Sequence, residues 1–201
     1  MKRILSLLLL VSTVAFAAPL SAPFTHDGIF ANASAGIGYA SFENADGEKS
    51  IIANGFGAKL HGKLGYYVMQ DLALHVNLGY VMYSNFREAW YGVSRYTDHE
   101  FNILSSVYLG GGATYYVPEW NNVFFSGSLG VTGYDLDCRR YKGNTGLKAF
   151  SFDVGVGKDW WLSEHFAVGA SVEFNSAEYW SDDDGVFRSS SIMLLLSVTL
   201  N

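Results

Sequence analysis

The sequence predicts an all-β fold, an eight-stranded antiparallel up-and-down transmembrane β-barrel that fills one domain of the 201-residue chain. Three observations predict it. Apolar side chains alternate with small or polar ones in eight segments, which is typical of strands with two unlike faces. Short turns and long polar loops alternate between these segments. Charged residues make up only 16% of the chain, against about 25% in an average soluble protein, which leaves little to cover a water-facing surface.

The rest of the composition agrees with this fold. Hydrophobic residues reach 49%, yet the mean hydropathy is only +0.12, because apolar residues alternate with Gly, Ser and Asn instead of running together. The 22 glycines and 3 prolines suit tightly packed strands better than a disordered chain. Beyond the N-terminus no stretch approaches 18 consecutive apolar residues, so transmembrane helices are not predicted.

The N-terminus has the pattern of a signal peptide. Lys2 and Arg3 precede an apolar run that ends near Phe16, and residues 15–17 form a small-x-small cleavage site. The run is shorter than the roughly 20 residues that a membrane-spanning helix needs, so we expect cleavage near Ala18 rather than a retained anchor. The predicted organisation is a signal peptide at 1–17, a short N-terminal segment at 18–28 and the barrel at 29–201.

Charge and cysteine content exclude several classes of partner. The formal net charge is −6 and becomes more negative if Lys2 and Arg3 are removed, which argues against a nucleic-acid partner. Cys138 is the only cysteine, so no intramolecular disulfide is possible. We interpret it as an incidental loop residue; a reactive thiol or an intermolecular disulfide is the alternative. No Cys/His cluster has the spacing of metal ligands, and neither a metal nor a cofactor is expected.

The first three strands are predicted at residues 29–41, 52–68 and 72–83. In the first, apolar or small side chains from Ile29 to Tyr39 take alternate positions, and Asn, Ser and Gly take the others. A polar loop with an Asp-Gly turn signal joins the first strand to the second. Residues 69–71 form a short turn, and residues 84–100 form a long loop rich in charged and aromatic residues.

The next three strands are predicted at residues 101–117, 123–132 and 150–157, each with the same alternation. Residues 118–122 form the short turn between the first two of them. Residues 135–146 form a polar loop that contains Cys138, and residues 158–165 form another short turn.

The last two strands are predicted at residues 166–175 and 188–201, with a long loop at 176–187 between them. One face of the final strand is wholly apolar: Ile192, Leu194, Leu196, Val198 and Leu200. The other face is small and hydroxylated except for Met193 and Leu195, which we interpret as packing in a plug. Because an unpaired hydrophobic edge is unfavourable, this strand is expected to pair with the strand at residue 29 and to close the barrel.

The two faces of the predicted strands differ in charge. Every charged side chain on a predicted strand falls on the small, polar face, and none falls on the apolar face. Such alternation is typical of a transmembrane barrel with an apolar band outside and a polar interior. Eight strands enclose a space that side chains can fill, so we predict an interior network in which Glu173 pairs with Lys59 or Lys63. The members of the predicted network are Lys59, His61, Lys63, Tyr108, Asp153 and Glu173.

Aromatic residues recur next to the short turns, where an interfacial girdle is expected. They are Tyr66, Tyr67, Tyr115, Tyr116, Trp120, Trp160, Trp161 and Phe166.

With these features the chain resembles the small eight-stranded outer-membrane barrels of the OmpA/OmpX type. The segment from Val154 to Gly169 adds to the resemblance, since it has the glycine-strand, short turn, aromatic-strand unit of such domains. The resemblance implies a Gram-negative-type outer membrane, with both termini periplasmic and lipid and lipopolysaccharide around the barrel. It also implies periplasmic chaperones and the barrel-assembly machinery as partners during biogenesis.

The chain departs from the family in two ways. It ends in Leu200-Asn201 and not in the aromatic residue that the resemblance would make part of the assembly signal. No peptidoglycan-binding domain follows the barrel, so cell-wall tethering is not expected.

We expect a structural or surface-interaction role through four outward loops, with an unidentified extracellular ligand as a possible partner. The candidate contact residues are Trp90, Tyr91, Tyr179, Trp180, Asp182, Asp183 and Asp184. Simple packing of the loops on one another is the alternative for these residues.

Other functions are weighed against this one. A narrow pore is compatible with the fold, but opposite charges on one face favour a satisfied internal network over a conduit. A lipid A-modifying enzyme would need a nucleophile beside one of two His/Glu pairs, 99–100 or 164–165, and no aligned serine is evident, so no enzyme activity and no catalytic residue are predicted. A soluble lipocalin-like barrel would need a charged exterior, which the uncharged apolar columns oppose.

Overall fold

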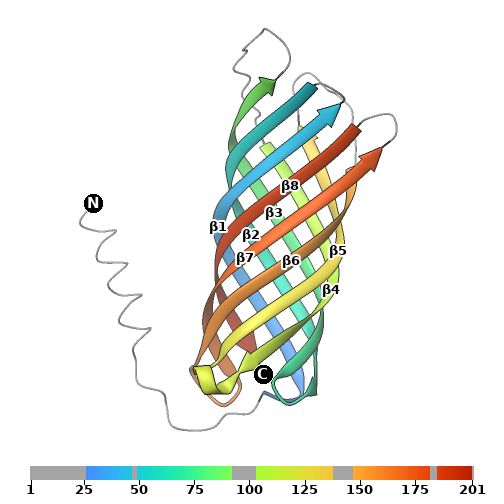
Figure 1. Ribbon diagram of the computed structural model, residues 1–201. Helices are drawn as coiled ribbons and strands as arrows, with labels where there is room; N and C mark the ends of the chain where they lie inside the picture. The colour runs from blue at the N-terminus through green and yellow to red at the C-terminus, as the bar shows by residue number, and fades with distance from the viewer. Residues whose placement is uncertain (1–25, 47–48, 92–102, 138–146, 182–184, 201) are drawn as a thin grey trace, which may run out of the picture.

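Eight antiparallel strands form one closed barrel, in which each strand pairs with its neighbours in the sequence and β8 pairs with β1 (Figure 1). The computed structural model describes residues 26–46, 49–91, 103–137, 147–181 and 185–200. The strands are β1 (Ile29–Asp46), β2 (Lys49–Met69), β3 (Leu72–Tyr91), β4 (Ile103–Val117), β5 (Val123–Asp137), β6 (Leu147–Trp161), β7 (Phe166–Ser181) and β8 (Gly185–Leu200). The predicted fold class is confirmed.

The seam between the first and last strands is paired along its whole length. The register runs from Ala31 opposite Leu200 to Ala45 opposite Val186. A closed barrel of this kind has no free sheet edge, so every backbone group of the strands can find a partner without water.

The short turns lie together at one end of the barrel, here called the short-turn end, where the chain also enters β1 and leaves β8 (Figure 1). Residues 70–71 join β2 to β3, a single 3₁₀ turn at Pro118–Trp120 precedes β5, and residues 162–165 join β6 to β7. Asp71, Asn121 and Asn122 have positive φ angles, which Asp and Asn adopt more readily than most residues. Among the residues that the structure describes, no helix has the length and hydropathy to cross a bilayer.

The outer face of the barrel is an apolar belt. On β8 the alternate residues from Ile192 to Val198 are each at least half exposed although all are aliphatic, and Leu196 reaches 67%. The same alternation exposes Leu60 and Leu64 on β2 and many further aliphatic side chains around the barrel. A continuous apolar surface that faces outward is the surface of a transmembrane barrel.

The strands extend further than the sequence analysis predicts. β3 continues to Tyr91 and β1 to Asp46, through stretches that were expected to be loop, and β6 includes residues 158–161, which were expected to be turn. The prediction ended each strand where the apolar alternation faded. Backbone pairing continues beyond that point, because hydrogen bonds between strands do not require lipid on one side.

Two predictions about the faces are wrong. Lys158 now belongs to β6 and shares the outer face with Val156, and Arg188 and Glu178 lie on the outer face of β8 and β7, so the outer face does carry charge near its two margins. The aromatic girdle is also only half as predicted. Tyr66 and Tyr115 point outward, whereas their neighbours Tyr67 and Tyr116 are buried inside the barrel.

Candidate functional site in the barrel interior

The centre of the barrel holds a cluster of buried charges around Glu173 of β7. Its Oε2 atom accepts a hydrogen bond from the Lys59 ammonium at 2.7 Å and one from Nδ1 of His61 at 3.1 Å. Its Oε1 atom accepts from the Lys63 ammonium at 3.1 Å. Alternation along β2 places these three residues on the inner face, one above another, so a single carboxylate across the barrel can reach all of them.

Asp153 of β6 completes the cluster by accepting a second hydrogen bond from Lys59 at 2.9 Å. The cluster thus contains two ammonium groups and two carboxylates, each with less than a tenth of its surface exposed. Charges so far from water are tolerable only when they are paired and hydrogen-bonded. The cluster of these four groups is therefore neutral overall.

Two further residues border the cluster. The Tyr108 hydroxyl is 2.7 Å from Oγ of Ser128, and its ring lies edge-on to the His61 ring at a centroid distance of 6.5 Å. Tyr108 therefore packs beside the charges without joining the ion pairs. Nε2 of His61 is buried and has no hydrogen-bond partner among the described residues.

All six residues predicted for the interior network lie in the interior. Five of them, Lys59, His61, Lys63, Asp153 and Glu173, are joined directly, and Glu173 contacts both predicted lysine partners. Gly155 makes this arrangement possible, because a Cβ atom there would lie 2.9 Å from Cγ of Glu173. The alternation in the sequence predicted that each of these residues faces the interior. It could not predict which of them pair, because that depends on which strands lie opposite one another in the barrel.

The sequence analysis missed a second polar network towards the short-turn end. Oδ2 of Asp159 accepts hydrogen bonds from the Tyr116 hydroxyl at 2.8 Å and from the Thr199 hydroxyl at 3.0 Å, and the Asn32 amide donates to Thr199 at 2.8 Å. Asp159 was assigned to a turn, so its face was not considered. It has the same parity as Asp153, and extending β6 by alternation would have placed it inside.

His75 of β3 is a further buried residue of the interior that the predicted network does not include. Its Nε2 atom is 2.9 Å from the Thr114 hydroxyl, and its Nδ1 atom contacts the side chain of Asn77. This trio lies beside the central cluster on β3 and β4.

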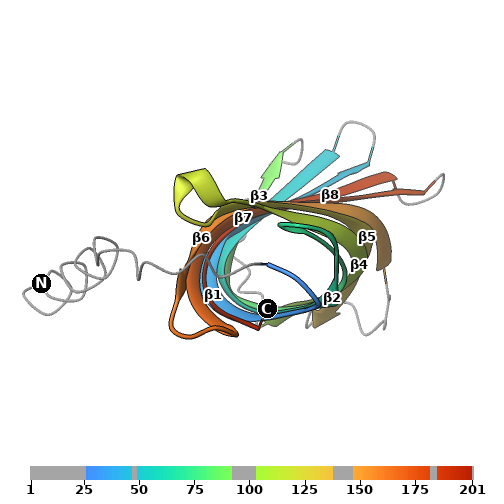
Figure 2. The same cartoon turned by 90° about the horizontal axis from the view of Figure 1, so that it is seen from below.

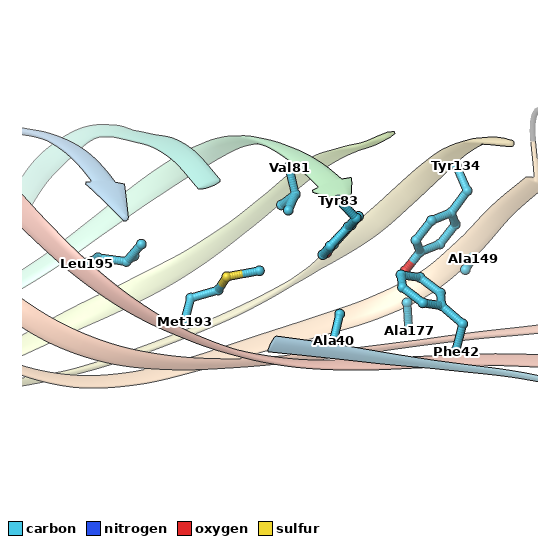
Figure 3. Close-up of a cluster of buried hydrophobic side chains, with 9 residues drawn as sticks. All are labelled: Ala40, Phe42, Val81, Tyr83, Tyr134, Ala149, Ala177, Met193 and Leu195. Carbon is cyan, nitrogen blue, oxygen red and sulfur yellow. The ribbon is translucent and has the colours of Figure 1, made fainter. Parts of the chain in front are cut away.

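Towards the long-loop end the interior changes from polar to apolar. Nine buried residues form a cluster that extends from the level of the ion cluster towards the long loops, here called the outer seal (Figure 3). They are Ala40, Phe42, Val81, Tyr83, Tyr134, Ala149, Ala177, Met193 and Leu195. The rings of Tyr83 and Tyr134 both meet Phe42 edge-on, at centroid distances of 5.3 and 5.9 Å. Met193 and Leu195, predicted as plug packing, lie in this layer with almost no exposed surface.

The short-turn end has a second apolar layer, here called the inner seal. It consists of Phe30, Tyr67, Ala73, Tyr116 and Phe124. His26, which precedes β1, is also buried there, and its ring stacks on Tyr116 at a centroid distance of 3.9 Å.

The turn next to the inner seal carries one perturbed acid. Burial raises the pKa of the Asp71 carboxyl, and the neighbouring His26 partly opposes this rise. The backbone of the same turn binds the inner seal, since the carbonyl of Asp71 accepts a hydrogen bond from the amide of Tyr116 at 2.8 Å.

The remaining candidate residues give no site. Trp90, Tyr91, Tyr179 and Trp180 lie on the ends of β3 and β7, but their side chains are outside the part of the chain that the structure describes, as are Asp182, Asp183 and Asp184. The pair at 99–100 also lies outside it, and Glu164 and His165 are exposed in the last short turn. In the described ranges no three His, Cys, Asp or Glu side chains are grouped to hold a metal ion.

Comparisons with known proteins identify the fold. No protein-family profile matches the chain, and no curated protein matches it. Among solved structures it is similar to neisserial surface protein A, with a TM-score of 0.52 and 17% identity over 86% of this chain and 96% of that one. It is also similar to the outer membrane protein OprG from Pseudomonas aeruginosa, with a TM-score of 0.46 and 12% identity over 87% and 96% of the two chains.

A third similar structure is Ail, the attachment invasion locus protein of Yersinia pestis, with a TM-score of 0.40 and 16% identity over 84% and 98% of the chains. At these identities the likeness to neisserial surface protein A concerns the fold alone. The chain has the fold of the small eight-stranded outer-membrane barrels, which confirms the resemblance drawn from its sequence.

Proposed function

We propose that the chain is an integral outer-membrane protein whose barrel is closed and which acts through its long-loop end, as a structural or surface-interaction protein. The apolar belt supports insertion in a bilayer, because its aliphatic side chains would otherwise face water. The likeness of the fold to neisserial surface protein A supports the outer membrane as the bilayer. Lipid and lipopolysaccharide are then the partners of the belt.

One observation carries the proposal: buried side chains cluster in the interior from the short-turn end to the outer seal. The outer seal, the central ion cluster and the inner seal together occupy the inner face of all eight strands. A water-filled conduit through such a barrel would have to separate the pairs that Glu173 makes with Lys59 and Lys63 and also move apolar layers on both sides of them. Because a closed barrel does not conduct, we infer that the protein acts through contacts at its long-loop end.

At the long-loop end the strands continue beyond the apolar belt. Near that end, Arg188 of β8 donates hydrogen bonds to Glu178 of β7 at 3.0 and 3.2 Å on the outer face, and its register partner on β1 is Glu43. This row of charges supports an upper limit of the lipid-facing surface at its level, because charged side chains are unfavourable in hydrocarbon. The strands β3 and β1 continue past that level, to Tyr91 and Asp46, and would carry the loops away from the membrane.

Single-channel recording tests the closed barrel. Refolded full-length protein in a planar bilayer is expected to give no steady conductance. A sustained conductance would show a pore and would overturn the proposal. The variant Phe42→Ala serves as a comparison, since it thins the outer seal without touching the ion cluster.

The orientation is tested on intact cells. An antibody raised against a peptide of residues 92–102 is expected to bind the cell surface, whereas one against residues 118–122 is expected to bind only after the membrane is opened. The opposite result would invert the orientation and remove the long loops as contact sites. Both termini are proposed to be periplasmic because the described chain enters β1 and leaves β8 at the short-turn end (Figure 1).

A further inference from the structure

The short-turn mouth of the barrel is crossed by a segment that is not part of any strand. Figure 2 shows the start of the described chain passing over the opening before it enters β1. The segment is His26–Gly28, here called the strap. Its backbone is held at two points, where the carbonyl of Gly28 accepts from the amide of Tyr67 at 2.9 Å and the carbonyl of His26 accepts from the amide of Asp71 at 3.4 Å.

The strap places one side chain in the inner seal. The His26 ring, 1% exposed, stacks on Tyr116 and lies 4.9 Å from the Trp161 ring and 5.7 Å from the Tyr67 ring, measured between centroids. Its Nδ1 atom is 3.3 Å from the Tyr67 hydroxyl. The neighbouring side chain, Asp27, is exposed. The strap therefore completes the inner seal with a single ring.

The strap differs from both seals. All residues of the outer and inner seals belong to strands of the barrel, so they cannot leave without loss of the strand pairing. His26 precedes β1, and its segment is held outside the strand pairing by the backbone hydrogen bonds and ring contacts given above. Gly28 gives that segment a joint, since its φ of +76° is a conformation that L side chains rarely adopt.

Behind the strap and the inner seal lie the buried polar side chains of Asp159, Thr199, His75 and Thr114, here called the polar chamber. Tyr116, which carries the stacked ring of His26, donates its hydroxyl hydrogen to Asp159. Further in, Lys63 contacts Ser126 at 3.3 Å as well as Glu173. A cleft of about 360 Å³ already runs along the edge of the strap, lined by His26–Gly28 and residues 66–70 of β2 and its turn.

We propose that the strap is a closure of the short-turn mouth, which the His26 ring holds shut and which opens without unfolding of the strands. Opening gives water and small solutes access to the polar chamber as far as the central ion cluster. The outer seal stays in place, so an open strap makes a vestibule and not a pore.

Site-directed labelling tests this closure. In a Cys138→Ser background, a reporter cysteine replaces Thr114, which is 2% exposed and lies between the inner seal and the ion cluster. A matched reporter replaces Thr132, 3% exposed on the far side of the cluster. Each folded protein, in detergent, is treated with a charged methanethiosulfonate reagent, and the labelling rate is measured.

The variants remove the closure in two ways. His26→Ala deletes the ring, and Gly28→Ala strains the joint, where an added Cβ meets no atom within 4 Å and the positive φ is the only obstacle. Glu164→Ala, at an exposed residue of another turn at the same end of the barrel, is the control. Both closure variants are expected to speed labelling at position 114 by about tenfold or more, with position 132 unchanged and the heat-dependent gel shift retained.

The outcomes separate the closure from a general loss of stability. Unchanged labelling at 114 in His26→Ala and Gly28→Ala would overturn the proposal. Equal acceleration at 114 and 132, or the same acceleration in Glu164→Ala, would also overturn it, because either result shows loosening that is not specific to the strap. The test needs no assumption about the long loops, so it can fail or succeed independently of the proposed function.

Discussion

Glu173 makes three of the four ion pairs of the central cluster. It binds Lys59, His61 and Lys63 at once, in a place where water does not compete. Replacing it with alanine would leave two buried ammonium groups with only Asp153 as a counter-charge. Loss of one partner from a buried pair commonly costs about 3–5 kcal/mol.

We therefore expect Glu173→Ala to lower the free energy of unfolding by about that amount, measured by denaturant titration of the refolded protein in lipid or detergent. The control is Glu178→Ala, which breaks an exposed pair with Arg188 and should cost about 0–1 kcal/mol. Equal unfolding curves for Glu173→Ala and the unchanged protein would show that the cluster adds nothing to stability.

A second prediction concerns Gly169, a glycine on the inner face of the barrel. At Gly169 an added Cβ would lie 1.9 Å from Oδ1 of Asp159 and 2.6 Å from Oγ of Ser197. Gly169→Ala must displace the carboxylate that holds Tyr116 and Thr199, and we expect a cost of about 1–3 kcal/mol in the same titration.

The matched glycine is Gly127 on the outer face, where an added Cβ meets no atom within 4 Å. Gly127→Ala is expected to change the free energy of unfolding by no more than about 0.5 kcal/mol. If both glycine variants are equally stable, steric crowding inside the barrel is not what selects glycine at position 169.

For single residues, alternation predicted the face well and the contacts poorly. The inner position of Lys59 and Glu173 followed from parity alone, yet their contact spans 114 residues and depends on how the barrel closes. The inner position of Asp159 also follows from parity. It was not predicted, because the predicted strand ended at residue 157 and β6 continues to Trp161. His26 was not predictable, since it lies outside any strand and its burial comes from the path of the strap.

Among the elements, β8 allows the sharpest test of the apolar belt. Leu196 is 67% exposed in the middle of the apolar row from Ile192 to Leu200, whereas Ser190 lies on the same face near the charged row. A lysine costs about 2–4 kcal/mol at the midplane of a bilayer and about 0–1 near its margins.

Leu196→Lys is thus expected to reduce the yield of inserted barrel strongly, and Ser190→Lys to leave it nearly unchanged. Refolding into liposomes, followed by comparison of boiled and unboiled samples on a gel, measures the yield. Equal yields for the two lysine variants would contradict a lipid-facing β8.

The elements also show where prediction from sequence stops. All eight strands were predicted in the correct order, because each has a core of alternating residues. Most strands are longer at the long-loop end than predicted. In β3 the predicted strand ended at residue 83, because the stretch that contains Arg87, Glu88 and Trp90 has no apolar face. Beyond the membrane both faces of a strand can be polar, and composition no longer distinguishes strand from loop.

For the whole molecule, a closed and fully paired barrel predicts resistance to detergent. The seam between β1 and β8 is paired from Ala31 to Ala45, so unfolding cannot begin at a free edge. Unboiled protein in dodecyl sulfate is expected to migrate as a compact band, distinct from the boiled chain. Identical mobility before and after boiling would contradict the closed barrel.

The ion cluster also bears on assembly. Sliding β8 along β1 by two residues would keep every apolar side chain facing lipid, so the belt alone cannot distinguish that arrangement from the native one. The slip would move β7 relative to β2 by about 7 Å, and Glu173 would no longer reach Lys63. The ion pairs of Glu173 therefore favour the native register of β8 on β1 over a register shifted by two residues.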